Sequence, residues 1–167
     1  MSLSYSEETN IARNPLDLLE EIAAANDWPH ERASGDELAV EISGRWCDYR
    51  LFFMRQEDLR ALHFTCLFES RVGIDRRAEI YHLLALVNEK LWLGHFDLST
   101  EEGTPMFRHT LLLRGAGAAN VEQLEDLVDV AVSESDRYFP AFQFVIWGGK
   151  SAEDAMASAL IEVAGSA

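Results

Sequence analysis

Between residues 38 and 68 the sequence places apolar side chains at every second position in three successive runs. Successive side chains of a β-strand point to opposite faces of the sheet, so this alternation predicts three strands with one buried face each. The apolar positions are Leu38, Val40 and Ile42, then Cys47, Tyr49, Leu51 and Phe53, then Leu62, Phe64, Cys66 and Phe68. Three consecutive strands joined by short polar turns predict an antiparallel meander.

The turn residues predict how these strands pair. Gly44-Arg45 suits a two-residue hairpin turn, and this register places the apolar sets of neighbouring strands on one face. The second turn, around Gln56-Glu57-Asp58, must hold an even number of residues for the same reason. The pairs expected from this register are Ile42–Cys47, Val40–Tyr49, Leu38–Leu51, Phe53–Leu62 and Leu51–Phe64.

Segments with helical spacing flank the strands. Asn14-Pro15 resembles an N-cap followed by proline at the first helical position, and it opens a helix that we expect over Pro15 to Asn26. Further helices are expected over Asp75 to Leu91, ended by Gly94, from Val121 onward with a kink or break at Pro140, and over Ala152 to Val163. Two more strands, His95 to Leu98 and Met106 to Arg114, precede the long helix, and the second is apolar on both faces, as a central strand is.

The predicted order is α-β-β-β-α-β-β-α, an α+β fold with a five-stranded antiparallel sheet and segregated helices. A chain of 167 residues is of single-domain size. We therefore expect one domain over residues 15–167. Residues 1–14 are polar and aperiodic, which predicts a flexible N-terminal tail.

The charge balance narrows the classes of partner. The chain has 14 Lys and Arg against 29 Asp and Glu, a formal net charge of −15. Binding to nucleic acid or to anionic lipid depends on Lys and Arg, so neither nucleic acid nor a membrane surface is expected as a partner. The sequence begins without a secretory signal pattern, and its two cysteines are far apart. These features favour a cytoplasmic, reducing location.

The residue types that carry chemistry do not form a recognisable catalytic, cofactor or metal motif. The run "RGAGAAN", Arg114 to Asn120, has glycines before a helix, but it lacks the third glycine of a dinucleotide fingerprint and fits a loop ending in an N-cap. The five histidines lack metal-ligand spacing, Cys47 and Cys66 lack a C-x-x-C partner, and no G-x-S-x-G elbow is present. We therefore expect no enzyme activity and no cofactor.

Apolar residues also occupy the second face of the predicted sheet. Either helices cover both faces, or the second face is an exposed patch that another chain covers. The candidate protein-binding residues on it are Trp46, Phe52, Met54, Leu67, Met106 and Leu112. A second aromatic group, Tyr138 to Trp147, has helical spacing that favours core packing, with a dimer or peptide contact as the alternative.

Two segments resemble a known bacterial family. The run "ESDRYFPAFQFVIWGGKSAEDAMASALIEVAG", Glu134 to Gly165, and the run "HLLALVNEKLWLGHFDL", His82 to Leu98, are similar to alphaproteobacterial YbjN-domain proteins, described as sensory transduction regulators. The resemblance implies a fold similar to type III secretion chaperones. The family has no established catalytic residues, so it implies none here.

Two functions remain open from the sequence. The first is a non-enzymatic protein-binding module, chaperone-like or regulatory, that acts through an apolar sheet or helix surface and forms a homodimer. The alternative is a signal transduction regulator that senses a small ligand. An exposed apolar patch or groove would favour the first, and an enclosed pocket with a few converging polar groups would favour the second.

Overall fold

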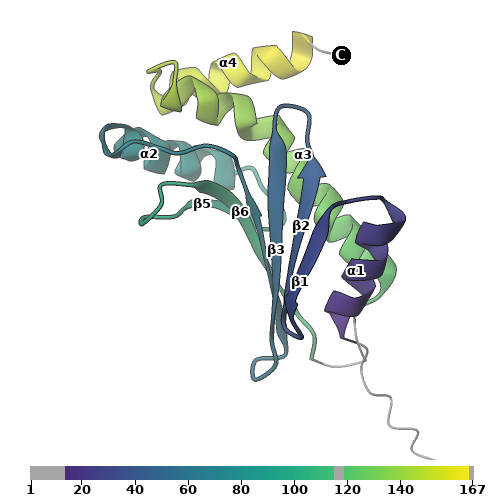
Figure 1. The fold of residues 1–167 in the computed structure, drawn as a ribbon. Helices are drawn as coiled ribbons and strands as arrows, with labels where there is room; N and C mark the ends of the chain where they lie inside the picture. Colours follow the sequence, from purple (N-terminus) through teal and green to yellow (C-terminus); the bar gives the residue numbers. More distant parts are fainter. Residues whose placement is uncertain (1–13, 115–118, 166–167) are drawn as a thin grey trace, which may run out of the picture.

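The computed structural model describes residues 14–114 and 119–165, and for residues 162–165 it describes the backbone alone (Figure 1). Its elements are α1 Pro15–Ala25, β1 His30–Ser34, β2 Glu37–Ser43, β3 Asp48–Gln56, β4 Ala61–Leu67, the 3-10 turn η1 Ile74–Arg76, α2 Arg77–Asn88, β5 His95–Leu98, β6 Pro105–Leu112, α3 Val121–Ile146 and α4 Ala152–Gly165. Of the predicted N-terminal tail, only Asn14 is among the described residues, and its side-chain oxygen accepts the backbone N–H of Leu16 as an N-cap does.

The six strands form one sheet in the order β1-β2-β3-β4-β6-β5. Every neighbouring pair is antiparallel, which confirms the α+β class and the meander of β2, β3 and β4. The expected number of five strands is wrong, because β1 forms an additional edge strand. Its sequence, HERAS, shows no apolar alternation, and four of its five positions are exposed. An edge strand without a buried face leaves no hydrophobic period in the sequence.

The register predicted for the first hairpin is wrong by two residues. Val40 lies opposite Leu51 rather than Tyr49, and the turn spans residues 44–47 instead of Gly44-Arg45 alone. The cause is a contact from α3: Oδ1 of Asp136 accepts the backbone N–H of Arg45 at 2.9 Å and the hydroxyl of Tyr49 at 2.7 Å. A Cβ at Gly44 would overlap the Tyr49 ring, so the wider turn requires glycine there.

The second hairpin shows the same displacement. Phe53 faces Phe64 rather than Leu62, and the turn spans residues 57–60, so its even length is confirmed. Both errors are of two residues, which returns each side chain to the same face of the sheet. The predicted apolar face is therefore the buried one, although the individual partners differ.

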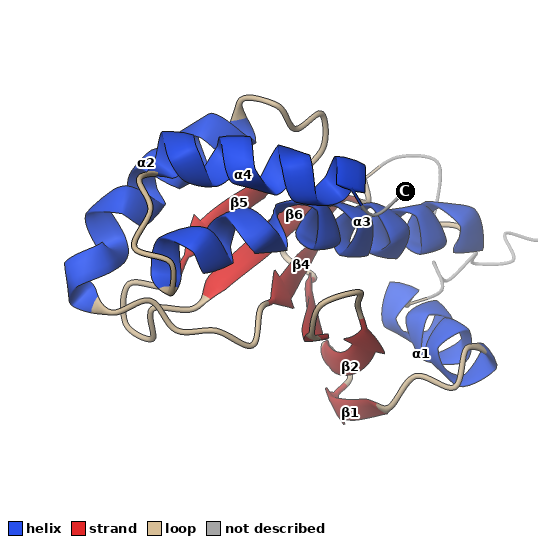
Figure 2. Ribbon diagram, turned by 90° about the horizontal axis from the view of Figure 1, so that it is seen from above, coloured by secondary structure: helices blue, strands red, loops and turns tan. Residues whose placement is uncertain are grey.

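The four helices of the described residues lie on one side of the sheet, as the view from above shows (Figure 2). There α1 packs against β1, β2, β3 and α3, α2 packs against β5, α3 and α4, and α3 lies antiparallel to α4 across a short turn. The core between the layers is aromatic. The rings of Phe53 and Phe64 stack with centroids 4.8 Å apart, and Phe68 meets Phe142 edge-on at 5.2 Å.

Two predicted helices have different limits in the structure. α2 is preceded by the 3-10 turn and ends at Asn88, before the expected Leu91. α3 continues through Pro140 to Ile146, so the predicted break is wrong. Proline lacks the N–H that would bond to the carbonyl four residues earlier. That carbonyl, of Asp136, instead accepts the indole N–H of Trp46 at 3.0 Å.

The aromatic group at the end of α3 packs as its spacing predicts, with one exception. Tyr138 and Phe142 are buried, and Phe139 and Phe144 are half-buried against the core. Trp147, at the C-cap of α3, is 76% exposed.

Candidate functional site

No helix in the described part of the chain covers the sheet face opposite α1, α2, α3 and α4, and we call it the open face (Figure 2). Strand alternation assigns to it every second residue of β2, β3, β4, β6 and β5. The cross-strand pairs on this face include Glu41–Arg50, Arg50–Leu67 and Leu67–Met106 in one row, and Phe52–Thr65 and Thr65–Arg108 in the next. Apolar and charged side chains are therefore interleaved on it.

Four of the six predicted binding residues lie close together on the open face. Phe52 and Met54 follow each other on β3 and are 36% and 49% exposed. Leu67 and Met106 face each other across β4 and β6 and are half-buried. Phe52 and Leu67 are diagonal neighbours, within reach of an aromatic side chain. These four residues, Phe52, Met54, Leu67 and Met106, form what we call the apolar patch.

The other two predicted residues lie elsewhere. Leu112 is on the open face at the far end of β6, opposite Ala61, and is 74% exposed. Trp46 belongs to the turn between β2 and β3. Its indole nitrogen bonds to α3, and the Arg45 guanidinium lies 4.9 Å from its ring centroid. Its contacts tie the turn to α3, outside the apolar patch.

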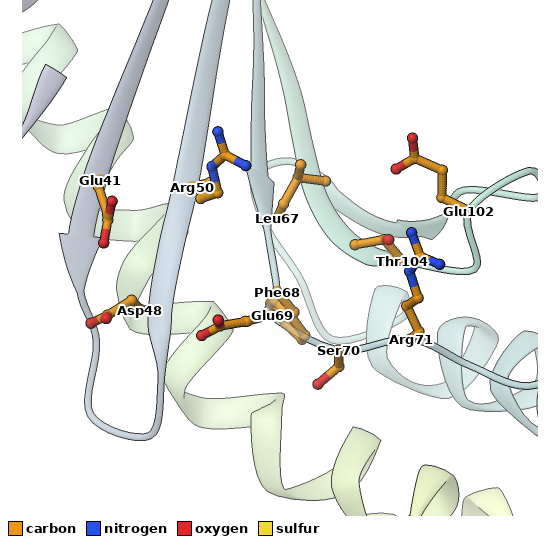
Figure 3. Close-up of a pocket in the computed structure, with 10 residues that line it drawn as sticks. All are labelled: Glu41, Asp48, Arg50, Leu67, Phe68, Glu69, Ser70, Arg71, Glu102 and Thr104. Atoms are coloured by element: carbon orange, nitrogen blue, oxygen red, sulfur yellow. The ribbon is translucent and has the colours of Figure 1, made fainter. Parts of the chain in front are cut away.

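A hollow of about 620 Å³ adjoins the apolar patch at Leu67 (Figure 3). Its walls come from three places: the ends of β2, β3 and β4, the segment that follows β4, and the loop between β5 and β6. The lining residues are Glu41, Asp48, Arg50, Leu67, Phe68, Glu69, Ser70, Arg71, Glu102 and Thr104. A smaller hollow of about 240 Å³ lies over β1 and β2 and shares Glu41 and Arg50 with the first. Because the two hollows are adjacent at these residues, we call them together the groove.

Carboxylates predominate in the groove. Figure 3 shows acidic side chains on both sides of the larger hollow, with Glu41, Asp48 and Glu69 on one side and Glu102 on the other. Arg50 and Arg71 are the cationic residues among those lining the groove. The Arg50 guanidinium lies 5.4 Å from the ring centroid of Phe52. None of the ion pairs found in the described part of the chain involves a residue of the groove.

The segment after β4 is held in place from the helix layer. Ser70 accepts a hydrogen bond from the side-chain amide of Gln143 at 2.9 Å. Phe68, in the same segment, anchors into the aromatic core. The wall of the groove is therefore fixed to α3.

The titratable groups with the most shifted pKa values lie outside the groove, on the covered side of the sheet. Burial, followed by the hydrogen bond to Asp136, raises the pKa of Tyr49. Burial raises the pKa of the Cys66 thiol to about 12, and the thiol lies 3.7 Å from the Ser135 hydroxyl. These are packed structural groups, as the sequence suggested for Cys66. Cys47 is only half-buried, in the turn between β2 and β3.

The glycine-rich run before α3, the potential metal ligands and the hydrophobic segments were the other candidate motifs. Asn120 caps α3 in a capping box with Gln123, as the loop interpretation predicts, while residues 115–118 of "RGAGAAN" lie outside the described residues. Across the described residues no cluster of His, Cys, Asp and Glu could hold a metal ion. No described helix has the length and hydropathy to cross a membrane.

The sequence correctly places Phe52, Met54, Leu67 and Met106 on one sheet face, but it does not predict the groove beside them. Period-2 alternation places Glu41 and Arg50 outward, and this signal was available. Arg71, Glu102 and Thr104 come from irregular segments, where no periodicity predicts that they converge.

Comparison with known proteins adds the family. No curated protein matches the chain. Among solved structures, one titled "Crystal structure of YbjN, a putative transcription regulator from E. coli" is similar in fold, with a TM-score of 0.51 and 12% sequence identity, over 72% of this chain and 85% of that one. A family model described as "YbjN: Putative bacterial sensory transduction regulator" matches residues 15–144. The chain therefore belongs to the YbjN family.

Proposed function

We propose that this protein is a non-enzymatic binding module, chaperone-like in fold, that holds a polypeptide segment on its open face in a regulatory role. The observation that carries this proposal is the apolar patch, which lies directly beside a groove on a sheet face that none of the described helices covers. Burial of apolar surface contributes about 25 cal/mol per Å², so covering these side chains would favour association. A regulatory role is compatible with the family to which the chain belongs.

The arrangement suits binding better than catalysis. The patch offers large, flexible side chains, Met54 and Met106 among them, and methionine adapts its shape to different apolar partners. The groove beside it adds charged and polar side chains that can fix orientation and register.

A photo-crosslinking experiment tests the site. Benzoylphenylalanine in place of Phe52 should capture protein partners in living cells on irradiation. The matched control carries the same group in place of Tyr81, an aromatic residue of α2 that is 48% exposed. Equal capture from the two positions, or none from position 52, would remove the open face as the binding site.

A stability measurement separates a binding face from a core face. Because Phe52 and Met54 are exposed, the double variant Phe52→Ser/Met54→Ser should keep its melting temperature within about 3 °C of the parent, or roughly 1 kcal/mol for a chain of this size. It should also lose partner capture. Unfolding of the variant would mean that the patch is part of the core.

The proposal includes a homodimer in the cytoplasm. Exposed apolar side chains that could serve a second contact lie on the helix layer, at Trp147, Leu160 and Ile161. Light scattering of the purified chain at high micromolar concentration should give twice the monomer mass. A monomer under those conditions contradicts the dimer and leaves the open-face proposal standing.

A small-ligand sensor is the second candidate, and the larger hollow is the observation that favours it. Its volume of about 620 Å³ falls within the range of ligand pockets. A thermal-shift screen of metabolites tests it: a sensor would yield a ligand that raises the melting temperature in the parent but not in Arg71→Ala.

A further inference from the structure

We infer that the segment held on the open face is an extended, cationic stretch of polypeptide that lies across the strands in the groove. This inference rests on the proposed function and specifies the chemistry of the partner. It follows from the course of the groove, its excess of carboxylates and the apolar patch on its border.

The groove has the length for a short extended segment. The smaller hollow lies over β1 and β2 beside Glu31, the larger one is lined by Arg71 and Glu102, and Glu41 and Arg50 line both. Neighbouring strands lie about 4.8 Å apart, so crossing from β1 to β4 takes about 14 Å. An extended chain rises about 3.3 Å per residue, and four or five residues would therefore cross these strands.

The charged residues that line the groove favour an occupant with positive charge. Five carboxylates line it, on Glu31, Glu41, Asp48, Glu69 and Glu102, against the two guanidinium groups of Arg50 and Arg71. Lysine or arginine side chains would meet carboxylates at both ends of the groove. An acidic segment would meet repulsion there.

Charge also argues against a second copy of this chain on the open face. The groove of a second copy would bring its own five carboxylates against those of the first, and like charges that face each other across an interface oppose association. A foreign basic segment avoids that repulsion, and the field of the whole molecule would attract it.

The apolar patch adds a second requirement. Leu67 lines the larger hollow and also belongs to the patch, with Phe52 diagonal to it and Met106 opposite. A segment lying in the groove would therefore place an apolar side chain against Leu67. Basic residues alone would leave this contact unused.

Peptide binding tests the inference directly. The probe is a fluorescein-labelled decapeptide of alternating pairs, Lys-Lys-Val-Val, with both ends blocked, and binding is followed by fluorescence anisotropy. It should bind the full chain, and its affinity should fall as salt increases from 50 to about 300 mM, because the Debye length shortens toward 6 Å. Peptides with Glu for Lys, or with Ser for Val, should bind at least about tenfold more weakly, since each replacement removes one of the two kinds of contact.

Variants then locate the binding. Glu41→Gln/Glu102→Gln should weaken the Lys-Val peptide roughly three- to tenfold, the effect of losing two exposed charge pairs. The control is Glu125→Gln/Asp129→Asn, which removes the same charge from the exposed side of α3. Equal weakening in both variants would show attraction to the net charge alone and would overturn the inference. Circular dichroism confirms that each variant is folded.

The crosslinking at position 52 separates this inference from the proposed function. If capture occurs there but the captured segments are not enriched in Lys and Arg, the open face binds protein and the cationic segment is wrong. If capture fails at position 52 and the peptides also fail to bind, both proposals fall.

Discussion

At the scale of single residues, Trp46 satisfies a backbone carbonyl that Pro140 leaves without a hydrogen bond. Proline inside α3 leaves the Asp136 carbonyl without its helical partner, and the indole N–H of Trp46 occupies it at 3.0 Å. The unused acceptor thus binds the turn between β2 and β3 to the helix. The sequence predicts Trp46 as a binding residue because alternation assigns it to the second face of the sheet, whereas in the structure its indole N–H bonds to α3.

A double-mutant cycle tests this pairing. Trp46→Phe should cost about 1 kcal/mol of unfolding free energy, the usual value of one hydrogen bond. In the Pro140→Ala background the cost should fall toward zero, because the alanine N–H at position 140 would itself bond to the Asp136 carbonyl. Urea unfolding at equilibrium measures both. The control cycle pairs Pro140→Ala with Trp92→Phe, at a residue 77% exposed, and should be additive. Additivity in the Trp46 cycle as well would show that the two residues are not linked.

The same residues show where sequence reasoning stops. Period-2 alternation places Phe52, Met54, Leu67 and Met106 on one face, and the structure places them together. The turn at residues 44–47 could not be predicted, because its width is set by Asp136, which lies 91 positions beyond Arg45 along the chain. Local patterns identify a strand face, whereas a distant side chain decides the register.

At the scale of elements, the two edges of the sheet are protected differently. β1 is polar and exposed. Among the described strands β5 pairs with β6 alone. The side chain of Asn88 bonds both backbone groups of Phe96, accepting from its N–H at 2.7 Å and donating to its carbonyl at 3.0 Å. The backbone N–H of Leu98 bonds to Oδ1 of Asp97. Side chains thus occupy backbone groups that would otherwise pair with another strand.

We predict that the Asn88 side chain prevents another strand from pairing with the exposed edge of β5. Asn88→Ala should cost about 1 to 3 kcal/mol, since it leaves both groups of Phe96 unpaired, and it should make the protein associate at high concentration through the opened edge. Asn88→Asp keeps the acceptor, so the Phe96 amide should stay protected from hydrogen exchange in that variant and lose protection in Asn88→Ala. Equal exchange in the two variants would contradict the assigned role, and light scattering measures the association.

Element types were easier to predict than element limits. The apolar stripes of α1, α2 and α3 and the alternation of β2, β3 and β4 follow from burial against one core, so the sequence carries their period. β1 has almost no buried side chain, and α3 continues past its proline, where a contact from another element occupies the freed carbonyl. Both failures occur where tertiary contacts, not local preference, decide the structure.

At the scale of the whole molecule, the dominant property is the excess of negative charge. With 29 acidic against 14 basic residues, many carboxylates have no cation to pair with. Some arginines are already shared, since Arg32 contacts both Asp17 and Glu20 at 3.0 Å. A surplus of one sign destabilises the compact state through repulsion, and the same field would attract a basic segment to the groove.

Salt should therefore stabilise this protein. Raising sodium chloride from 20 to about 300 mM shortens the Debye length from roughly 20 Å to about 6 Å, which screens the long-range repulsion more than the close ion pairs. We expect the melting temperature to rise by about 3 °C, or roughly 1 kcal/mol for a chain of this size. The Glu125→Gln/Asp129→Asn variant removes two exposed charges from α3, so it should melt higher than the parent at low salt and gain less from added salt. Differential scanning calorimetry of both proteins measures the two effects.

A melting temperature that falls with salt would mean that favourable ion pairs, such as Arg55 with Asp36 at 2.9 Å, outweigh the repulsion. The long-range attraction assigned to the groove would then lose its basis.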